Sequence, residues 1–179
     1  MIASIARRYA RALLEVAAPQ GEADAAAAQL AALAQSLETS ADLRNVLFNP
    51  AFDRARRHAV VEALAGSLGL GKTVLSLALL LVDRERFHLL PAIAASYRDL
   101  ADELAGRARA SVASAAPLPP EVARRVEQVL SGAVSRQVTI EPTVQPALLG
   151  GVVAQVGSLL FDGSVRTQLE NLRRSLKAG

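Results

Sequence analysis

The sequence predicts a mainly α protein, with an N-terminal six-helix bundle followed by a small α/β C-terminal domain. Up to about Gly106, apolar residues recur at spacings of three and four, which is the period of helices with one buried face. Beyond Gly106, apolar and polar residues alternate in several segments, which is typical of half-buried strands. The composition, 51% hydrophobic but only 3% aromatic, favours close-packed alanine-rich helices. We therefore place the two domains at residues 1–106 and 107–179.

Helix start and stop signals divide the first domain into its expected helices. Pro19 and Gly21 end the first helix. Asp53 can cap the fourth helix, and Pro91 suits the first turn of the sixth. The expected helices are the segment before Pro19, Glu22–Leu37, Leu43–Phe48, the segment from Asp53 to Leu68, Thr73–Arg86 and Pro91–Leu104.

The spacing of apolar residues predicts which face of each helix is buried. In the second helix, Leu30, Leu33 and Leu37 share one face. In the first helix the apolar positions are Ile2, Ile5, Tyr9, Leu13 and Val16. In the fourth helix we expect Ala59, Val60, Ala63, Leu64 and Leu68 to be buried, and Arg54, Arg56 and Arg57 to face solvent.

The second domain is expected to contain strands, a connecting helix and a final helix. Residues 107–115 and 137–144 alternate as strands do, and Pro142 places the end of the second strand at a sheet edge. Gly157 and Ser158 form a glycine-first hairpin turn between two further apolar segments. The connecting helix begins at Pro119-Pro120 with Val122, Val126, Val129 and Ala133 on one face, and the final helix carries Val165, Leu169, Leu172 and Leu176.

The composition excludes several classes of site. With no cysteine, the chain can form neither disulfides nor zinc-thiolate sites, and thiol catalysis is excluded. The arginine groups lack interleaved aromatic residues for base stacking, so no nucleic-acid binding is expected despite the net charge of +3. The longest strongly apolar stretch, Val74–Val82, is shorter than the roughly 18 residues of a membrane span, so we expect no direct membrane insertion. The arginine-rich start imitates a transit peptide, but its helical period favours a first helix.

The segment Gly66–Thr73 fits the phosphate-loop template, and Asp83 follows at the end of an apolar run. A phosphate loop needs a strand that leads into a helix N-terminus. The residues before Gly66 have a helical period instead, and a strand–helix–strand unit needs about 30 residues, more than separate Lys72 from Asp83. A nucleotide-binding protein is the alternative function, and the sequence predicts that the match is accidental.

Other catalytic or metal chemistry has little support. His58 and His88 are isolated histidines in helical segments, which favours surface or packing roles over metal ligation. No Gly-x-Ser-x-Gly elbow is present to support a hydrolase. We therefore predict no catalytic residue, no metal ligand and no cofactor.

Two apolar helices suggest a surface for a partner. The helix through Val74–Val82 is apolar almost all round, and the first helix has a narrow stripe with Ala10 and Leu13 beside Tyr9. Side by side, they would form a groove for a third, amphipathic helix. The same pattern equally fits two ordinary core helices.

The C-terminal stretch "LLGGVVAQVGSLLFDGSVRTQLENLRRSL" resembles the signature of the delta-subunit family of bacterial F-type ATP synthases, which is related to the mitochondrial oligomycin-sensitivity-conferring protein. "RRYARALLEV" near the start and "FHLLPAIAASYRDLADELAG" before the domain junction agree with the same family. One departure is Gln145, where the family more often has Asp. The matching positions of the signature are Gly150, Gly151, Gly157, Asp162, Gly163, Ser164, Leu169 and Leu172.

The resemblance implies a stator that links the catalytic head to the stalk and catalyses nothing. The bundle would bind the N-terminal helix of an alpha subunit in a groove between the first and fifth helices, and the second domain would bind the ends of the b-subunit stalk dimer. The protein would work on the cytoplasmic side of a bacterial cell membrane as a peripheral part of the synthase. Val165, Leu169, Leu172 and Leu176 would belong to the second core, although the same face could contact the stalk. The groove would be lined by Tyr9, Ala10, Leu13, Val74, Leu77, Ala78 and Leu81.

Overall fold

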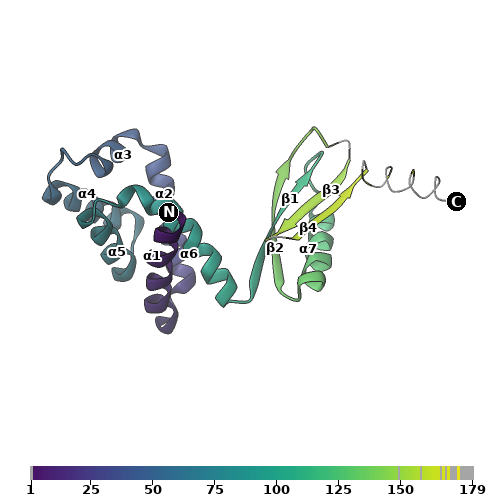
Figure 1. Ribbon diagram of the computed structural model, residues 1–179, viewed down its shortest axis with the longest axis horizontal. Helices are drawn as coiled ribbons and strands as arrows, with labels where there is room; N and C mark the ends of the chain where they lie inside the picture. Colours follow the sequence, from purple (N-terminus) through teal and green to yellow (C-terminus); the bar gives the residue numbers. More distant parts are fainter. Residues whose placement is uncertain are drawn as a thin grey trace. The chain divides into compact units, whose positions relative to one another are not determined.

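The computed structural model describes residues 2–148, 150–157, 159–165, 167, 169 and 173. The chain divides into two compact units, Met1–Asp102 and Glu103–Gly179 (Figure 1). The first unit is helical and the second combines a sheet with a helix, which confirms the predicted class of a mainly α protein with a small α/β part. The division falls in the last turn of helix α6, slightly before the junction expected at Gly106.

Caps and left-handed residues set the boundaries of the helices in the first unit. The Ser40 side chain accepts a hydrogen bond from the Leu43 amide at the start of α3, and Asp53 accepts one from the Arg56 amide at the start of α4. Gly69, at φ +64, ends α4. The described elements are α1 (Ile2–Ala17), η1 (Ala18–Gln20), α2 (Ala23–Thr39), α3 (Ala41–Phe48), α4 (Arg54–Leu68), α5 (Lys72–Asp83), η2 (Phe87–Leu89) and α6 (Leu90–Leu104).

The core of the first unit is built from leucine and alanine. Leu30, Leu33 and Leu37 of α2 are fully buried, as the sequence predicts. The buried face of α1 consists of Ala6, Ala10, Leu13 and Ala17, and its small side chains leave room for the neighbouring helices. Tyr97 of α6 is also fully buried, and its hydroxyl donates a hydrogen bond to the Ala23 carbonyl at 3.2 Å. Burial, followed by the negative charge of Asp24, raises the pKa of Tyr97.

The buried face predicted for α4 is wrong: the residues that are buried lie one position further along the chain than the predicted Val60 and Leu64. Val61 and Ala65 are buried, whereas Ala59 and Ala63 are exposed and Val60, Leu64 and Leu68 are only half-buried. Arg57, expected to face solvent, lies on the buried face. The alanines on both sides of this helix blur its apolar stripe, so the sequence pattern does not fix the rotation of the helix about its axis.

The second unit is a four-stranded sheet with the order β2-β1-β3-β4. Strands β1 and β2 are parallel because α7 connects them as a crossover, and the other pairs are antiparallel. Helix α7 lies against one face of the sheet (Figure 1), where Leu130 packs on Val112, Val138 and Ala154 in one buried cluster. The elements are β1 (Arg107–Ser114), α7 (Pro120–Val134), β2 (Gln137–Val144), β3 (Gly151–Val156) and β4 (Leu159–Ser164).

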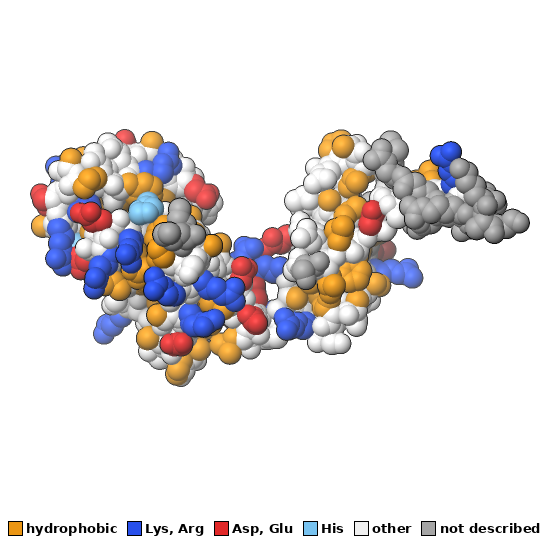
Figure 2. Space-filling model, in the orientation of Figure 1, with side chains coloured by type: hydrophobic (Ala, Val, Ile, Leu, Met, Phe, Trp, Pro, Cys, Tyr) orange, Lys and Arg blue, Asp and Glu red, His pale blue; other side chains and the backbone are white. Residues whose placement is uncertain are grey.

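Two predictions for the second unit are corrected. Val122 and Val129 of α7 are exposed. The buried position is that of Leu130, between the half-buried Val126 and Val134. Val165 and Leu169 are exposed rather than part of the core, while Leu172 and Leu176 lie outside the described residues. Figure 2 shows apolar side chains, in orange, that reach the visible surface of both units.

Candidate functional site

The Gly66–Thr73 segment connects two helices. Helix α4 continues through Gly66 and ends at Leu68, and α5 begins at Lys72. The Gly71 amide, which a phosphate loop would direct at its ligand, instead donates to Gln29 Oε1 at 2.9 Å. No strand leads into this turn among residues 54–83, so the geometry that the phosphate-loop motif requires is not present there.

An open groove of about 490 Å³ lies between α1 and α5. Its walls include Val16 and Leu80, which are 51% and 41% exposed and are among the exposed large apolar side chains of the first unit. Polar side chains also contribute to its lining, among them Gln20, Lys72 and Thr73. The full lining is Tyr9, Ala12, Leu13, Val16, Gln20, Lys72, Thr73, Ser76, Leu77 and Leu80.

The groove lies where two apolar helices predict it, but the predicted lining is only partly right. Tyr9, Leu13 and Leu77 do line it. The other predicted residues lie in the core beneath it, with exposed fractions of 0% for Ala10, 1% for Val74, 1% for Ala78 and 0% for Leu81.

The error has a physical cause in α5. Because this helix is apolar almost all round, its periodicity does not distinguish the core face from the groove face. Thr73, Ser76 and Leu80, spaced by three and four, form the face that sequence reasoning missed. The two hydroxyl side chains were the available signal, since polar residues within an apolar helix usually mark its outer face. The other missed lining residues are Ala12, Val16, Gln20 and Lys72.

A hydrogen bond between α1 and the segment after α5 positions one wall of the groove. Arg86 Nη1 donates to the Tyr9 hydroxyl at 3.1 Å, between residues far apart in the sequence. Tyr9 itself is half-buried, with its ring packed against the core. The bond therefore helps to hold the aromatic wall in place while its partner atoms remain near solvent.

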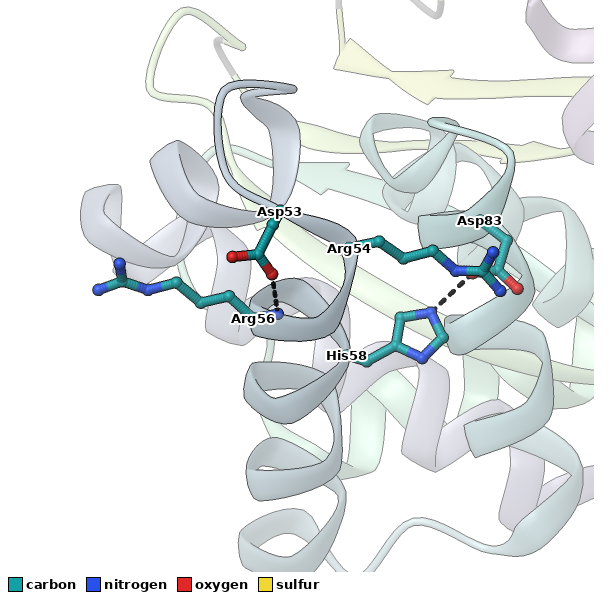
Figure 3. Close-up of polar contacts among 5 residues, drawn as sticks. All are labelled: Asp53, Arg54, Arg56, His58 and Asp83. Carbon is teal, nitrogen blue, oxygen red and sulfur yellow. Dashed lines mark hydrogen bonds and ion pairs between the residues drawn. The ribbon is translucent and has the colours of Figure 1, made fainter.

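The C-terminal end of α5 is tied to α4 by Asp83 (Figure 3). Asp83 Oδ1 lies 2.6 Å from Arg54 Nε and 2.7 Å from His58 Nε2. Desolvation alone would raise the pKa of Asp83, but the His58 hydrogen bond and the Arg54 charge outweigh it and lower that pKa below the ordinary value of 3.8. This cluster therefore links the C-terminal end of α5 to the first turns of α4.

In the second unit, the glycine-rich signature holds a hairpin. A Cβ on Gly151, which has φ +82, would overlap the carbonyl oxygen of Gly163 on the paired strand. Asp162 Oδ1 accepts from the Ser164 amide at 2.9 Å, and Oδ2 accepts from the Thr167 hydroxyl at 2.8 Å. The backbone hydrogen bond from Ser164, and then the hydroxyl bonds of Ser164 and Thr167, lower the pKa of Asp162. These signature residues therefore have structural roles.

In the part of the chain that the structure describes, no group of three or more His, Cys, Asp or Glu side chains is placed to hold a metal ion. Within the same residues, no helix combines the length and the apolar character needed to cross a membrane.

Comparisons with known proteins agree along nearly the whole chain. The sequence model of the family described as ATP synthase delta (OSCP) subunit matches residues 5–176. The ATP synthase subunit delta of Myxococcus xanthus (strain DK1622) is 51% identical over 176 residues, which are 97% of this chain and 97% of that relative. The ATP synthase subunit delta of Anaeromyxobacter dehalogenans (strain 2CP-C) is 49% identical over 177 residues and 99% of each chain. In fold, the chain is similar to one from the Toxoplasma gondii mitochondrial ATP synthase hexamer, with a TM-score of 0.71 and 21% identity over 97% of this chain and 98% of that one.

Proposed function

The chain belongs to the ATP synthase delta (OSCP) subunit family, and we infer that its two units bind two different parts of one synthase. It is a non-catalytic, structural subunit of the peripheral stalk of an F-type ATP synthase. We propose that α1–α6 act as one six-helix bundle that holds the catalytic head, and that the second unit binds the ends of the b-subunit stalk dimer. The complex would place the protein on the cytoplasmic side of a bacterial cell membrane.

The observation that carries the first contact is the groove between α1 and α5. Its Val16 and Leu80 side chains are exposed to water, and covering them with another apolar surface would be favourable in free energy. A groove between two helices fits one face of a third, amphipathic helix. We propose that this occupant is the N-terminal helix of an alpha subunit, which would bury apolar area at roughly 25 cal/mol per Å².

The second unit offers apolar side chains for a separate contact. Val129 on α7 and Leu160 on β4 are exposed by about two thirds, at 66% and 65%. Both are available to a partner without any change in the packed cluster around Leu130. This exposure supports, for the second unit, an apolar contact with the b-subunit stalk.

Two contacts on one chain suit a mechanical role. Rotation driven by proton flow does useful work on the catalytic head only if the head is prevented from turning with the rotor. A subunit that binds the head through one unit and the stalk through the other would supply that restraint. Because both contacts are carried by the same chain, the second contact benefits from a high effective concentration, which slows dissociation.

Titration calorimetry of the full chain tests the head contact. The probe is a synthetic peptide with the N-terminal sequence of the alpha subunit from the same synthase. We expect saturable binding, and a loss of affinity of about tenfold or more for Leu80→Glu, because a carboxylate would be buried against the peptide. Leu104→Glu is the matched control, since Leu104 is 62% exposed and does not line the groove. No heat of binding from a chain with a helical circular dichroism spectrum would remove the groove proposal.

The stalk contact has its own test. A soluble fragment with the C-terminal ends of the b subunits should bind the full chain, and Leu160→Glu should weaken that binding without weakening binding of the alpha peptide. A b fragment that binds Leu160→Glu as tightly as the unchanged chain would show that β4 lies outside the stalk contact.

A further inference from the structure

A second, smaller pocket lies in the first unit, apart from the groove. Its volume is about 140 Å³, and it is bounded by the end of α3, the first turns of α4, and the turn between α5 and α6. It shares no lining residue with the groove. The lining is Leu47, Phe48, Pro50, Arg57, Glu85, Phe87 and His88.

Arg57 gives this pocket its chemistry. Its side chain is on the buried face of α4, and the residue is only 6% exposed. The buried Nε atom has no hydrogen-bond partner among the described residues. Other arginines of this unit find acceptors, as Arg44 does at the Leu37 carbonyl and Arg86 at the Tyr9 hydroxyl. A buried guanidinium N–H without an acceptor is rare in folded proteins, because its lost hydration is not replaced.

The pocket presents this cation next to apolar walls. Leu47 and Phe87 are each 1% exposed and belong to the core, so the apolar surface open to a ligand is that of the exposed Phe48 and Pro50. A ligand that fits both surfaces has two oxygen acceptors on a short apolar stem. The two Nη groups of an arginine can donate two parallel hydrogen bonds to a carboxylate, which matches this description.

We propose that the Arg57 pocket binds the side-chain carboxylate of an acidic residue from a protein partner. Glutamate suits the pocket better than a free phosphate, because its methylene groups can cover the exposed Phe48 and Pro50 side chains while the carboxylate reaches Arg57. The rim also carries Glu85, an exposed residue at φ +55. The Glu85 carboxylate of this chain could therefore compete with a partner's carboxylate for Arg57.

Nuclear magnetic resonance of the ¹⁵N-labelled full chain tests the pocket directly. The readout is the Arg57 Nε–Hε cross-peak, assigned by its absence in Arg57→Lys. Propionate, a carboxylate on the same two-carbon stem as glutamate, is titrated against chloride at constant ionic strength. We expect a saturable shift of that cross-peak with propionate and none with chloride. A shift that does not saturate, or equal shifts with both salts, would overturn the proposal.

Three comparisons identify the source of the carboxylate. Acetyl-Ala-Glu-Ala-amide should saturate the same cross-peak, and its glutamine counterpart should not. If propionate saturates the site but this peptide does not, or if inorganic phosphate binds as tightly as propionate, the site is an adventitious anion site only. In Glu85→Gln, propionate should bind at least as tightly as in the unchanged chain. If propionate binds only in that variant, Glu85 fills the pocket and the partner is excluded.

Arg56→Met is the matched control for the basic surroundings. Arg56 is adjacent in sequence but exposed, and its guanidinium lies over the Phe52 ring at 5.4 Å from the centroid. We expect Arg56→Met to keep the saturable propionate shift at Arg57 within about twofold in midpoint. A complete loss in this variant would mean that general positive charge, and not the Arg57 pocket, attracts the carboxylate.

Discussion

The β3–β4 hairpin and the α1–α5 groove differ in what determines their residues. In the hairpin, backbone geometry leaves no choice at Gly151, where any Cβ would overlap Gly163, and Asp162 has specific donors in Ser164 and Thr167. In the groove, the walls need only be apolar, exposed and of suitable size.

This difference separates recognition of the family from recognition of the site. The glycine-rich signature helps to identify the family, and a steric contact explains its Gly151, yet this contact only holds a hairpin together. The groove is the surface proposed to bind a partner, yet its apolar lining residues are of the same types as those of the core beneath it. Substitutions in the core and the hairpin should therefore change stability, whereas substitutions in the groove should change affinity for a partner.

The largest effect is expected on the core side of α5. Leu81→Ala should lower the free energy of unfolding of the first unit by about 2–5 kcal/mol, because Leu81 is completely buried and its truncation leaves a cavity. Leu80→Ala, one residue away on the groove side, should cost less than about 1 kcal/mol. Urea unfolding followed by circular dichroism at 222 nm measures both. Equal losses would mean that the two faces of α5 do not differ in burial as described.

A large effect is also expected in the hairpin. Gly151→Ala should destabilise the second unit by roughly 1–3 kcal/mol through its overlap with Gly163, and by about a further 1 kcal/mol through the positive φ. The matched control is Gly157→Ala, where φ is +58 but no atom lies within 4 Å of an added Cβ. Only the conformational cost should remain there. Hydrogen exchange of the β3 and β4 amides measures the difference, and a Gly151→Ala chain as stable as Gly157→Ala would contradict the steric role.

Much of the fold could be predicted from local signals. Helix ends follow from caps whose chemistry is local, as at Asp53 and Ser40, and the parallel strand pair follows from the intervening helix. The rotation of a helix about its axis depends instead on which neighbours it packs against. For this reason the buried faces of α4 and α7 were predicted one residue away from where they lie, at Val61 and Leu130.

The groove could be placed but not resolved from the sequence. The apolar patterns of α1 and α5 offered a groove but fitted two core helices equally well, and the family resemblance favoured the groove. The sequence could not show that Leu80 and not Leu81 lines the groove, because both are leucine and only the tertiary packing determines which side chain faces solvent. Arg57 could not have been found either, because an arginine among arginines gives no sign of burial until the helix is packed.

A smaller effect is expected at the link between α4 and α5. The pKa of Asp83 is lowered in the folded chain, so its ionised form contributes stability above its ordinary value of 3.8, and this contribution is lost as the pH falls below that value through the folded pKa. Asp83→Asn should therefore lower the urea midpoint at pH 7, by less than Leu81→Ala does. The midpoints of Asp83→Asn and of the unchanged chain should converge as the pH falls below 3.8. Unfolding at pH 7, 5 and 3 measures this. A difference that persists unchanged at pH 3 would show that the Asp83 charge is not its source.

The smallest effect is expected at the aromatic wall of the groove. Tyr9→Phe removes only the acceptor of the 3.1 Å bond from Arg86, whose guanidinium can be hydrated instead, so stability should change by less than about 0.5 kcal/mol. The ring remains, and affinity for the alpha peptide should stay within about twofold, because an apolar wall needs its area and not its hydroxyl. Tyr9→Ala removes the ring and should weaken the peptide about tenfold in the same titration. If Tyr9→Phe weakened the peptide as much as Tyr9→Ala, the hydroxyl itself would contact the partner. The groove would then resemble the hairpin, with recognition set by one specific polar contact rather than by apolar shape.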